Sequence, residues 1–322
     1  MRGFAMVHPA IEPTETGMLD VGDGQLVYWE ASGNPNGKPA LALHSGPGVG
    51  SSPGRRRAFA SAGYRLVQFD QRGCGRSTPS VSDPSVGLEH NTTHHLIDDI
   101  ERLREHLGIE RWLVWGASWG TTLALAYAQR FPQRVSELVL LSVTLARPSD
   151  VHWLYHEAGR FFPAEWARFR EGAPEGDRHD LVAAYDRLLN EQPDPEVRAK
   201  AAADWCAWED AVLSLEEGWK PWDRFSDPAF RMTFARLCAH YFSNAAWLGE
   251  DELLRNMGRL AGIPGVLIHG RFDIQGPCDM PWLVAQAWPG AELELLPVGH
   301  SGGEAMMARM VEALARFAPG SR

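Results

Sequence analysis

The sequence of 322 residues contains no apolar run of about 18 residues, the length that a membrane-spanning helix needs. Its N-terminal stretch, MRGFAMVHPAIEPTE, has no apolar core, so no secretory signal is expected. Four cysteines are scattered without CxxC spacing, which predicts neither a metal site nor a disulfide framework. These absences favour a cytoplasmic protein with no membrane partner.

The sequence also lacks an excess of positive charge. Its net charge is −10, so neither nucleic acid nor an anionic membrane is expected as a partner. The one basic run, formed by Arg55, Arg56 and Arg57, is too short to reverse this balance, and we expect it to form a solvated helix start. The share of hydrophobic residues, 44%, is typical of a globular protein with a sizeable core.

Strand and helix patterns alternate along most of the chain. Alternation around a DG turn in 17–31 predicts an antiparallel pair at a sheet edge, and further strands are expected at 39–44, 64–70, 112–115, 134–143, 263–273 and 291–300. Helices are expected at 51–63, 96–109, 280–289 and 303–318. This order predicts an α/β fold with a doubly wound, mostly parallel sheet. Residues 146–258 show helical spacing only, so we expect a helical cap inserted into a domain made of 1–145 and 259–322.

Ser118 lies at the centre of the GASWG segment, between a buried strand and an apolar helix. A strand-to-helix turn that exposes a nucleophilic serine needs small residues on both sides, because the chain crosses close to itself there. The pattern alone is also compatible with a glycine-rich connection that carries a solvated serine. The strand before it and the helix after it favour the nucleophile.

A serine nucleophile needs a histidine base that is oriented by a carboxylate. Asp273 follows the strand VLIHG and His300 follows the strand LELLP, so both come at strand ends and in the order serine, acid, histidine. The alternatives are a loop carboxylate that makes a local turn and a surface histidine. Two placements in the correct order favour a Ser118, Asp273, His300 triad.

An oxyanion intermediate needs two backbone N–H donors. The residue after the nucleophile, Trp119, supplies one, and the HSGPG turn supplies the other, for which we choose Gly46. His44 in the same turn precedes the serine in the chain. We therefore expect it to fix the turn through hydrogen bonds instead of acting as the base.

Eight segments taken together resemble the prolyl aminopeptidase (proline iminopeptidase) family of α/β-hydrolases. They are HSGPG (44–48), DQRGCGRS (70–77), NTT (91–93), GASWG (116–120), WE (208–209), HYF (240–242), GRFD (270–273) and GHS (299–301). The resemblance implies an α/β-hydrolase fold with a helical cap. It also implies a cofactor-free, cytoplasmic serine peptidase that removes an N-terminal residue, preferably proline, from short peptides.

The resemblance implies that acidic cap residues hold the free α-amine of the substrate. Glu209 matches the glutamate of the WE motif; the alternative is a carboxylate on a helix surface. Two positions depart from the family pattern, since Cys238 stands where a second glutamate is expected and Leu141 where an arginine is expected. We interpret the paired loss as a pocket that is less polar and less negative than that of the family.

Two other functions stay open. The first is a hydrolase of the same fold that acts on another small amide, ester or thioester, which the departures at Cys238 and Leu141 favour and Glu209 disfavours. The second is a small-molecule receptor on the same scaffold, which an intact triad disfavours. Dehalogenase or epoxide hydrolase chemistry would need an aspartate at position 118. The sequence leaves the oligomeric state open.

Overall fold

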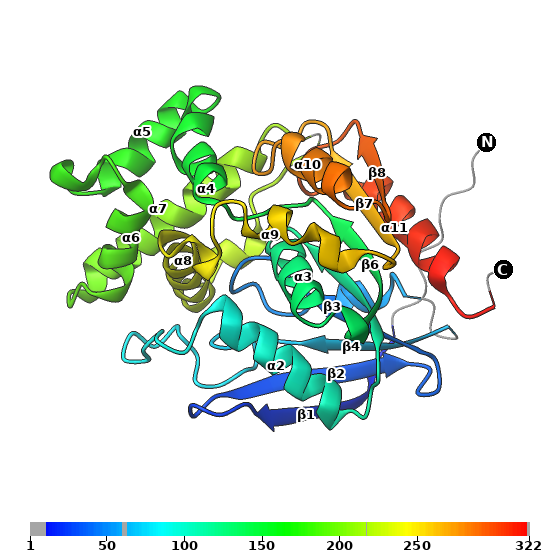
Figure 1. The fold of residues 1–322 in the computed structure, drawn as a ribbon. Coiled ribbons are helices and arrows are strands. Elements are labelled where there is room, and N and C mark those ends of the chain that lie inside the picture. Colours follow the sequence, from blue (N-terminus) through cyan, green and yellow to red (C-terminus); the bar gives the residue numbers. More distant parts are fainter. Residues whose placement is uncertain (1–10, 60–62, 217, 321–322) are drawn as a thin grey trace.

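An eight-stranded sheet runs through the molecule and is covered by helices on both faces (Figure 1). The structure, a computed structural model, describes residues 11–59, 63–216 and 218–320. The strands are β1 (Pro13–Asp20), β2 (Leu26–Gly33), β3 (Lys38–Leu43), β4 (Tyr64–Phe69), β5 (Trp112–Ala117), β6 (Val135–Leu141), β7 (Gly265–Gly270) and β8 (Ala291–Leu296). Residues 1–10, where no secretory signal is expected, lie outside the described part.

The strands lie in the order β1-β2-β4-β3-β5-β6-β7-β8. Strand β2 pairs antiparallel with β1 and β4, and the remaining pairs are parallel. The predicted hairpin at the sheet edge is therefore confirmed. Asp23 and Gly24 in its turn both have positive φ, as a tight turn between antiparallel strands requires.

The longer helices that cover the sheet are α2 (Thr93–His106), α3 (Trp119–Arg130), α10 (Asp279–Ala287) and α11 (Gly303–Phe317). Alternate residues of the buried strands face opposite sides of the sheet. In β5, Trp112 and Val114 belong to the core cluster that includes residues of α2, α3 and α10, whereas Leu113 and Trp115 belong to the cluster under α11. Both faces are apolar, which explains why these strands read as continuous hydrophobic runs.

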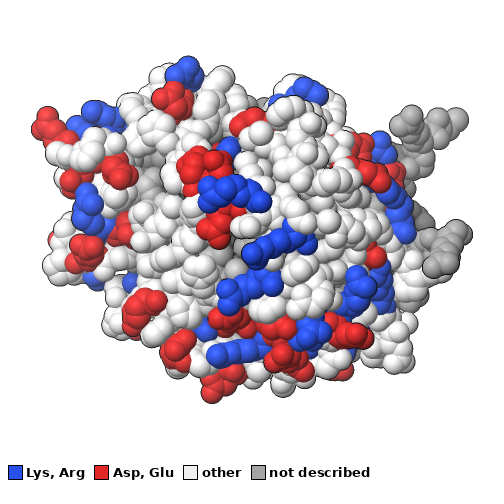
Figure 2. Space-filling view, in the orientation of Figure 1, with Lys and Arg blue, Asp and Glu red and all other residues white. Residues whose placement is uncertain are grey.

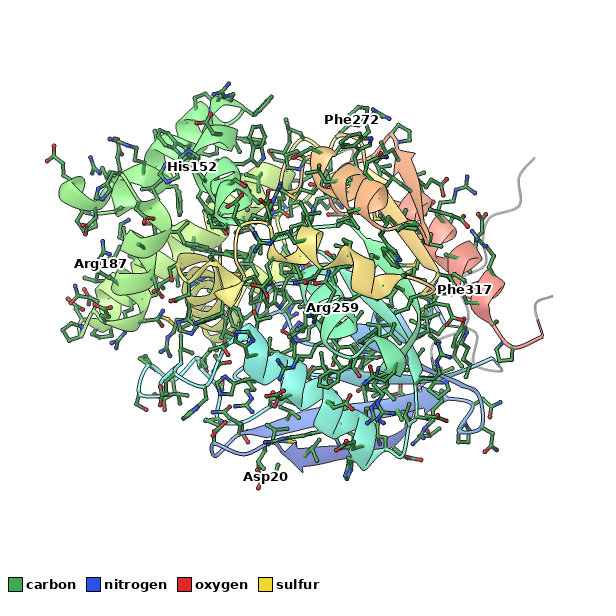
Figure 3. The ribbon with its side chains drawn as sticks, in the orientation of Figure 1. Asp20, His152, Arg187, Arg259, Phe272 and Phe317 are labelled. Atoms are coloured by element: carbon green, nitrogen blue, oxygen red, sulfur yellow. The ribbon has the colours of Figure 1, made fainter. Side chains whose placement is uncertain are left out.

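A separate layer of helices lies above the carboxyl ends of the strands (Figure 1). Its members are α4 (Pro148–Tyr155), α5 (Pro163–Gly172), α6 (Leu181–Asn190), α7 (Pro195–Leu213) and α8 (Pro228–Ser243), with the 3-10 turns η2 (Glu157–Arg160), η3 (Glu175–Asp177) and η4 (Asp223–Ser226). They enclose an aromatic-rich core of their own. His152 on α4 and Arg187 on α6, labelled in Figure 3, lie in this cap.

The chain returns to the sheet before residue 258. The elements η5 (Ala245–Trp247), α9 (Glu252–Arg255) and η6 (Met257–Leu260) contribute Ala246, Leu253 and Met257 to the core of the sheet domain. They contact α2 and α3, as does the turn η1 (Pro132–Arg134) with α3. In packing terms, the cap layer ends near residue 243.

The helix expected at 51–63 is much shorter than predicted, and residues 60–62 lie outside the described part. Helix α1 spans only Pro53–Arg56, and the expectation that the basic run is solvated is wrong for two of its three residues. Arg56 is 5% exposed and makes a bidentate ion pair with Glu30, with Nε–Oε1 and Nη2–Oε2 distances of 2.8 and 3.0 Å. Arg55 is partly buried against Trp115. A run of arginines in the sequence does not show which residues of distant strands will contact it in the folded protein.

No described helix is long and apolar enough to cross a membrane. On the face drawn in Figure 2, basic and acidic side chains are interspersed. The four cysteines Cys74, Cys206, Cys238 and Cys278 are free.

Candidate active site

Ser118 occupies a strained turn between β5 and α3. Its φ of 53° and ψ of −126° lie outside the regions that non-glycine residues ordinarily adopt. A Cβ atom at Gly116 would lie 2.3 Å from the carbonyl oxygen of Gly120, and one at Gly120 would lie 2.6 Å from that of Leu43. Both glycines are therefore required sterically. The turn places the serine at the carboxyl edge of the sheet, at the N-terminus of α3.

Asp273 and His300 are joined by a hydrogen bond. Strand β7 ends at Gly270 and β8 at Leu296, so Asp273 and His300 lie in the loops just beyond, as predicted from the strands VLIHG and LELLP, although the strands end before residues 273 and 300. His300 Nδ1 donates to Asp273 Oδ2 at 2.7 Å, and Asp273 Oδ1 accepts from the Gly276 amide at 2.8 Å. Burial disfavours the charged imidazole, but the Asp273 carboxylate outweighs it and raises the pKa of His300.

His269 supports this pair from below, and sequence reasoning missed it. Its Nδ1 accepts from the Val143 amide at 2.9 Å, so Nε2 carries the hydrogen and donates to the Gly276 carbonyl at 2.7 Å. Burial lowers the pKa of His269 and so favours this neutral form. The only available signal was a histidine in the otherwise apolar strand VLIHG. Phe272, beside Asp273, lies at the surface and is 62% exposed (Figure 3).

A second missed residue holds the histidine loop. Ser142, which follows β6 with a φ of 49°, donates its hydroxyl to the His300 carbonyl at 2.5 Å. Nothing in the sequence pattern marks this serine, because its partner lies far away in the chain.

The HSGPG turn faces the serine. Gly46 has a φ of +121°, and a Cβ there would lie 2.6 Å from the Gly48 nitrogen, so only glycine fits. His44 Nε2 accepts from the Gln71 amide at 3.1 Å, which leaves Nδ1–H to donate to the Ser45 carbonyl at 2.8 Å. His44 therefore fixes the turn, as expected.

Ser118, His300, Gly46 and Trp119 line one cavity of about 550 Å³ under the cap. The Trp119 indole donates to Gln71 at 3.0 Å, which ties the elbow to the loop after β4. The structure thus brings together the predicted triad and both predicted oxyanion residues. Their catalytic roles stay a prediction.

Glu209 on α7 projects into the same cavity and is 8% exposed, so the helix-surface alternative is wrong. Its Oε1 accepts from the Tyr155 hydroxyl at 2.6 Å and its Oε2 from Gln275 at 3.0 Å. Burial raises the pKa of Glu209 to about 7, while the Tyr155 hydrogen bond and the charge of His300 oppose the shift. Tyr155 and Gln275 were not predicted as site residues.

Cys238 and Leu141 line two different pockets. Cys238 on α8 lines the cavity of Glu209, and its Sγ lies 3.4 Å from the Pro47 carbonyl oxygen. Burial raises the pKa of this thiol well above its ordinary value, so it is inert. Leu141, the last residue of β6, lines an adjoining pocket of about 1250 Å³ that is open to solvent and also reaches Ser118.

The cap contacts the loops of the site. Trp153 on α4 donates to the Ile274 carbonyl at 2.7 Å, next to Asp273. Glu216, which follows α7, accepts from the Ser301 amide at 2.8 Å, next to His300. Opening of the cap would therefore break contacts on both sides of the triad.

One side-chain cluster of the described residues has ligand types for a metal ion. Asp23, His90 and His95 bring their ligand atoms within 4.8 Å of one another. The Arg72 guanidinium, which also pairs with Asp99, already donates to Asp23 Oδ2 at 3.0 Å and so competes with a cation for this carboxylate. Among the described residues, none of the three lines the cavity of Ser118.

Comparison with known proteins places the chain in a family. Residues 39–304 match the family model of the alpha/beta hydrolase fold. The chain is 47% identical to a probable proline iminopeptidase of Streptomyces coelicolor over 320 residues, which is 98% of each chain. It is 44% identical to the proline iminopeptidase of Xylella fastidiosa over 92% of this chain and 94% of that protein. The chain belongs to the proline iminopeptidase family of α/β hydrolases.

The family assignment confirms both the resemblance and the predicted fold class. A crystal structure of proline iminopeptidase from Mycobacterium smegmatis aligns with a TM-score of 0.59 over 93% of this chain and 98% of that chain. At 20% identity this similarity shows the fold alone.

Proposed function

We propose that this member of the proline iminopeptidase family releases an N-terminal residue, preferably proline, from short peptides or amides through an acyl-enzyme. The observation that carries the proposal is the shared cavity, in which a strained serine, a carboxylate-bound histidine and a buried glutamate face one space. The names of the relatives at 44% and 47% identity support the same activity.

The first half of the reaction forms the acyl-enzyme. Because Nδ1 of His300 donates to Asp273, Nε2 is free to accept the proton of the Ser118 hydroxyl as its oxygen attacks the scissile carbonyl. The amides of Trp119 and Gly46 stabilise the oxyanion. His300 then protonates the leaving amine, and the C–N bond breaks. A water molecule, deprotonated by His300, hydrolyses the ester and regenerates the serine.

Glu209 gives the reaction its requirement for a free amine. A cationic amine about 4 Å from a carboxylate gains roughly 4 kcal/mol at an effective dielectric near 20, before desolvation is subtracted. Because burial raises the pKa of Glu209 to about 7, amine binding also has to remove a proton from part of the enzyme population. Cys238 in this cavity adds no second charge, so Glu209 and the paired Asp150 are the carboxylates that line it within the described chain.

The second candidate is a same-fold hydrolase of another small amide, ester or thioester. It is favoured by Cys238 and by the partly protonated state of Glu209, which lower the negative charge of the cavity at neutral pH.

The two candidates differ in their need for the amine. Hydrolysis of proline β-naphthylamide, N-acetylproline β-naphthylamide and p-nitrophenyl esters should show that blocking the amine abolishes cleavage. Equal rates on the blocked and free substrates would favour the second candidate. Ser118→Ala should abolish turnover and labelling by a fluorophosphonate, whereas the exposed Ser85→Ala serves as the matched control. Near-normal turnover by Ser118→Ala would contradict the assignment of an acyl-enzyme mechanism.

We further propose that the enzyme works in the cytoplasm on small substrates. Its four free cysteines fit a reducing compartment, since extracellular domains commonly oxidise theirs. The position of Ser118 in a pocket under the cap supports small substrates, because a folded protein chain could not reach it.

A further inference from the structure

Arg55 is a cation near the active site without a counter-charge. Its guanidinium stacks on the Trp115 ring at 4.3 Å from the centroid. Its neighbour Arg56 pairs with Glu30, and Arg76 pairs with Asp70. In the described part of the chain, by contrast, no carboxylate lies within ion-pair distance of Arg55.

Arg55 is only partly buried, yet its guanidinium has no carboxylate partner among the described residues, whereas charges withdrawn from water in proteins are generally paired. Burial lowers the pKa of Arg55 to about 10, and no carboxylate counteracts that shift. At neutral pH the guanidinium is still charged. Its desolvation is therefore a cost that nothing in the described chain offsets except the face of Trp115.

Arg55 lines two neighbouring pockets. One is the open pocket that also contains Ser118 and His300. The other, of about 650 Å³, is lined by Arg55 together with Arg224, and the described residues that line it include no aspartate or glutamate. Arg224 stacks on the Phe230 ring at 3.8 Å and donates to a backbone carbonyl, so its charge is also without a carboxylate partner among the described residues.

The other charged groups of the open pocket do not neutralise Arg55. Asp210 accepts hydrogen bonds from the Trp222 amide at 3.2 and 3.4 Å. Glu209 is engaged by Tyr155 and Gln275 in the enclosed cavity. Lys220 is exposed at the rim and adds positive charge. Among the described residues the open pocket therefore holds both kinds of charge, with Arg55 and Lys220 as cations and Glu209 and Asp210 as carboxylates, and none of these carboxylates makes an ion pair with Arg55.

We propose that Arg55, assisted by Arg224, binds the C-terminal carboxylate of the peptide portion that leaves when Ser118 is acylated. This inference rests on the proposed function. A short peptide carries an amine at one end and a carboxylate at the other, and the open pocket that contains Ser118 is lined by both Glu209 and Arg55. The planar guanidinium suits a carboxylate, which it can bind with two parallel hydrogen bonds.

If Arg55 binds substrate, the enzyme should prefer peptides with a free C-terminal carboxylate. An arginine with only a structural role would give no such preference. Prolyl-alanine and prolyl-alaninamide share the scissile bond and differ in the C-terminal charge. The wild-type enzyme should cleave the free acid with a kcat/KM about tenfold higher than the amide, as expected for one hydrogen-bonded charge contact. The difference should lie in KM, because the carboxylate is remote from the reacting atoms.

Arg55→Gln should abolish this preference by raising KM for the free acid about tenfold, with a smaller change in KM for prolyl-alaninamide. Arg55→Lys should keep part of the preference. Arg168→Gln, which replaces an exposed cap arginine, is the matched control and should match wild type. An acid-to-amide ratio that stays the same in Arg55→Gln would overturn the inference.

The outcomes separate the two proposals. A wild-type enzyme that cleaves neither dipeptide nor β-naphthylamide overturns the proposed function and the inference with it. A wild type that cleaves acid and amide equally well overturns the inference alone, and this comparison needs no variant. If Arg55→Gln fails to fold, as judged by its thermal unfolding, Arg55→Met tests the same ratio with the apolar stem against Trp115 retained.

Discussion

Glu209→Gln should make the protein more stable at alkaline pH and less active on free-amine substrates. Burial raises the pKa of Glu209 from its ordinary value of 4.5 to about 7, so between these values the folded protein binds more protons than the unfolded chain. The stability that this proton provides is present below pH 4.5 and is lost as pH rises through 7. Over that window the loss is about 3 kcal/mol.

Glutamine removes this loss because it is neutral at every pH. Its side-chain oxygen can still accept from the Tyr155 hydroxyl, so the packing of the cavity is kept. We therefore expect the unfolding free energies of Glu209→Gln and wild type to agree near pH 4. Near pH 8 the variant should be more stable by about 3 kcal/mol.

Denaturant unfolding at the two pH values, followed by tryptophan fluorescence, measures the difference directly. Glu165→Gln, which replaces a partly exposed acid on α5, is the control and should show no such difference. On proline β-naphthylamide, Glu209→Gln should lower kcat/KM about a hundredfold, since part of the ion-pair energy with the amine is lost. A stability difference that is the same at pH 4 and pH 8 would refute the reasoning about the buried carboxyl.

Two further substitutions test the residues around the triad and the altered pocket. His269→Gln should lower kcat about tenfold with KM little changed, because the loop that holds Asp273 loses its support; a pH–rate profile identical to wild type in position and height would contradict this role. Cys238→Glu combined with Leu141→Arg should raise the preference for free-amine proline substrates in a panel of aminoacyl amides. If neither this double variant nor Cys238→Glu alone changes that preference, Cys238 has no part in specificity.

Much of the sheet domain could be predicted because its signals are local. Period-two and period-3.6 patterns set the strands and helices, and strand ends located Asp273 and His300 within three or four residues of β7 and β8. Boundaries were less accurate, since strands 263–273 and 291–300 end earlier than expected. The longest error was the helix at 51–63, where α1 covers four residues.

Side-chain partners could not be predicted where they come from distant segments. Tyr155 and Gln275 reach Glu209 from α4 and from the loop after β7, and no sequence spacing relates them. The basic run was interpreted as solvated because charge alone favours the surface, yet Glu30 and Trp115 draw Arg56 and Arg55 inward.

The sequence by itself determined the α/β-hydrolase fold and the family, and it predicted the nucleophile, base and acid, because the turn at Ser118 and the order of the strands depend on short segments with small residues at fixed places. The tertiary structure decided the electrical character of the site. Only packing shows that Glu209 is buried with a raised pKa and that Arg55 lines the same open pocket as Ser118 without a carboxylate partner in the described chain. Burial and charge pairing depend on which segments meet, and that is a property of the folded chain.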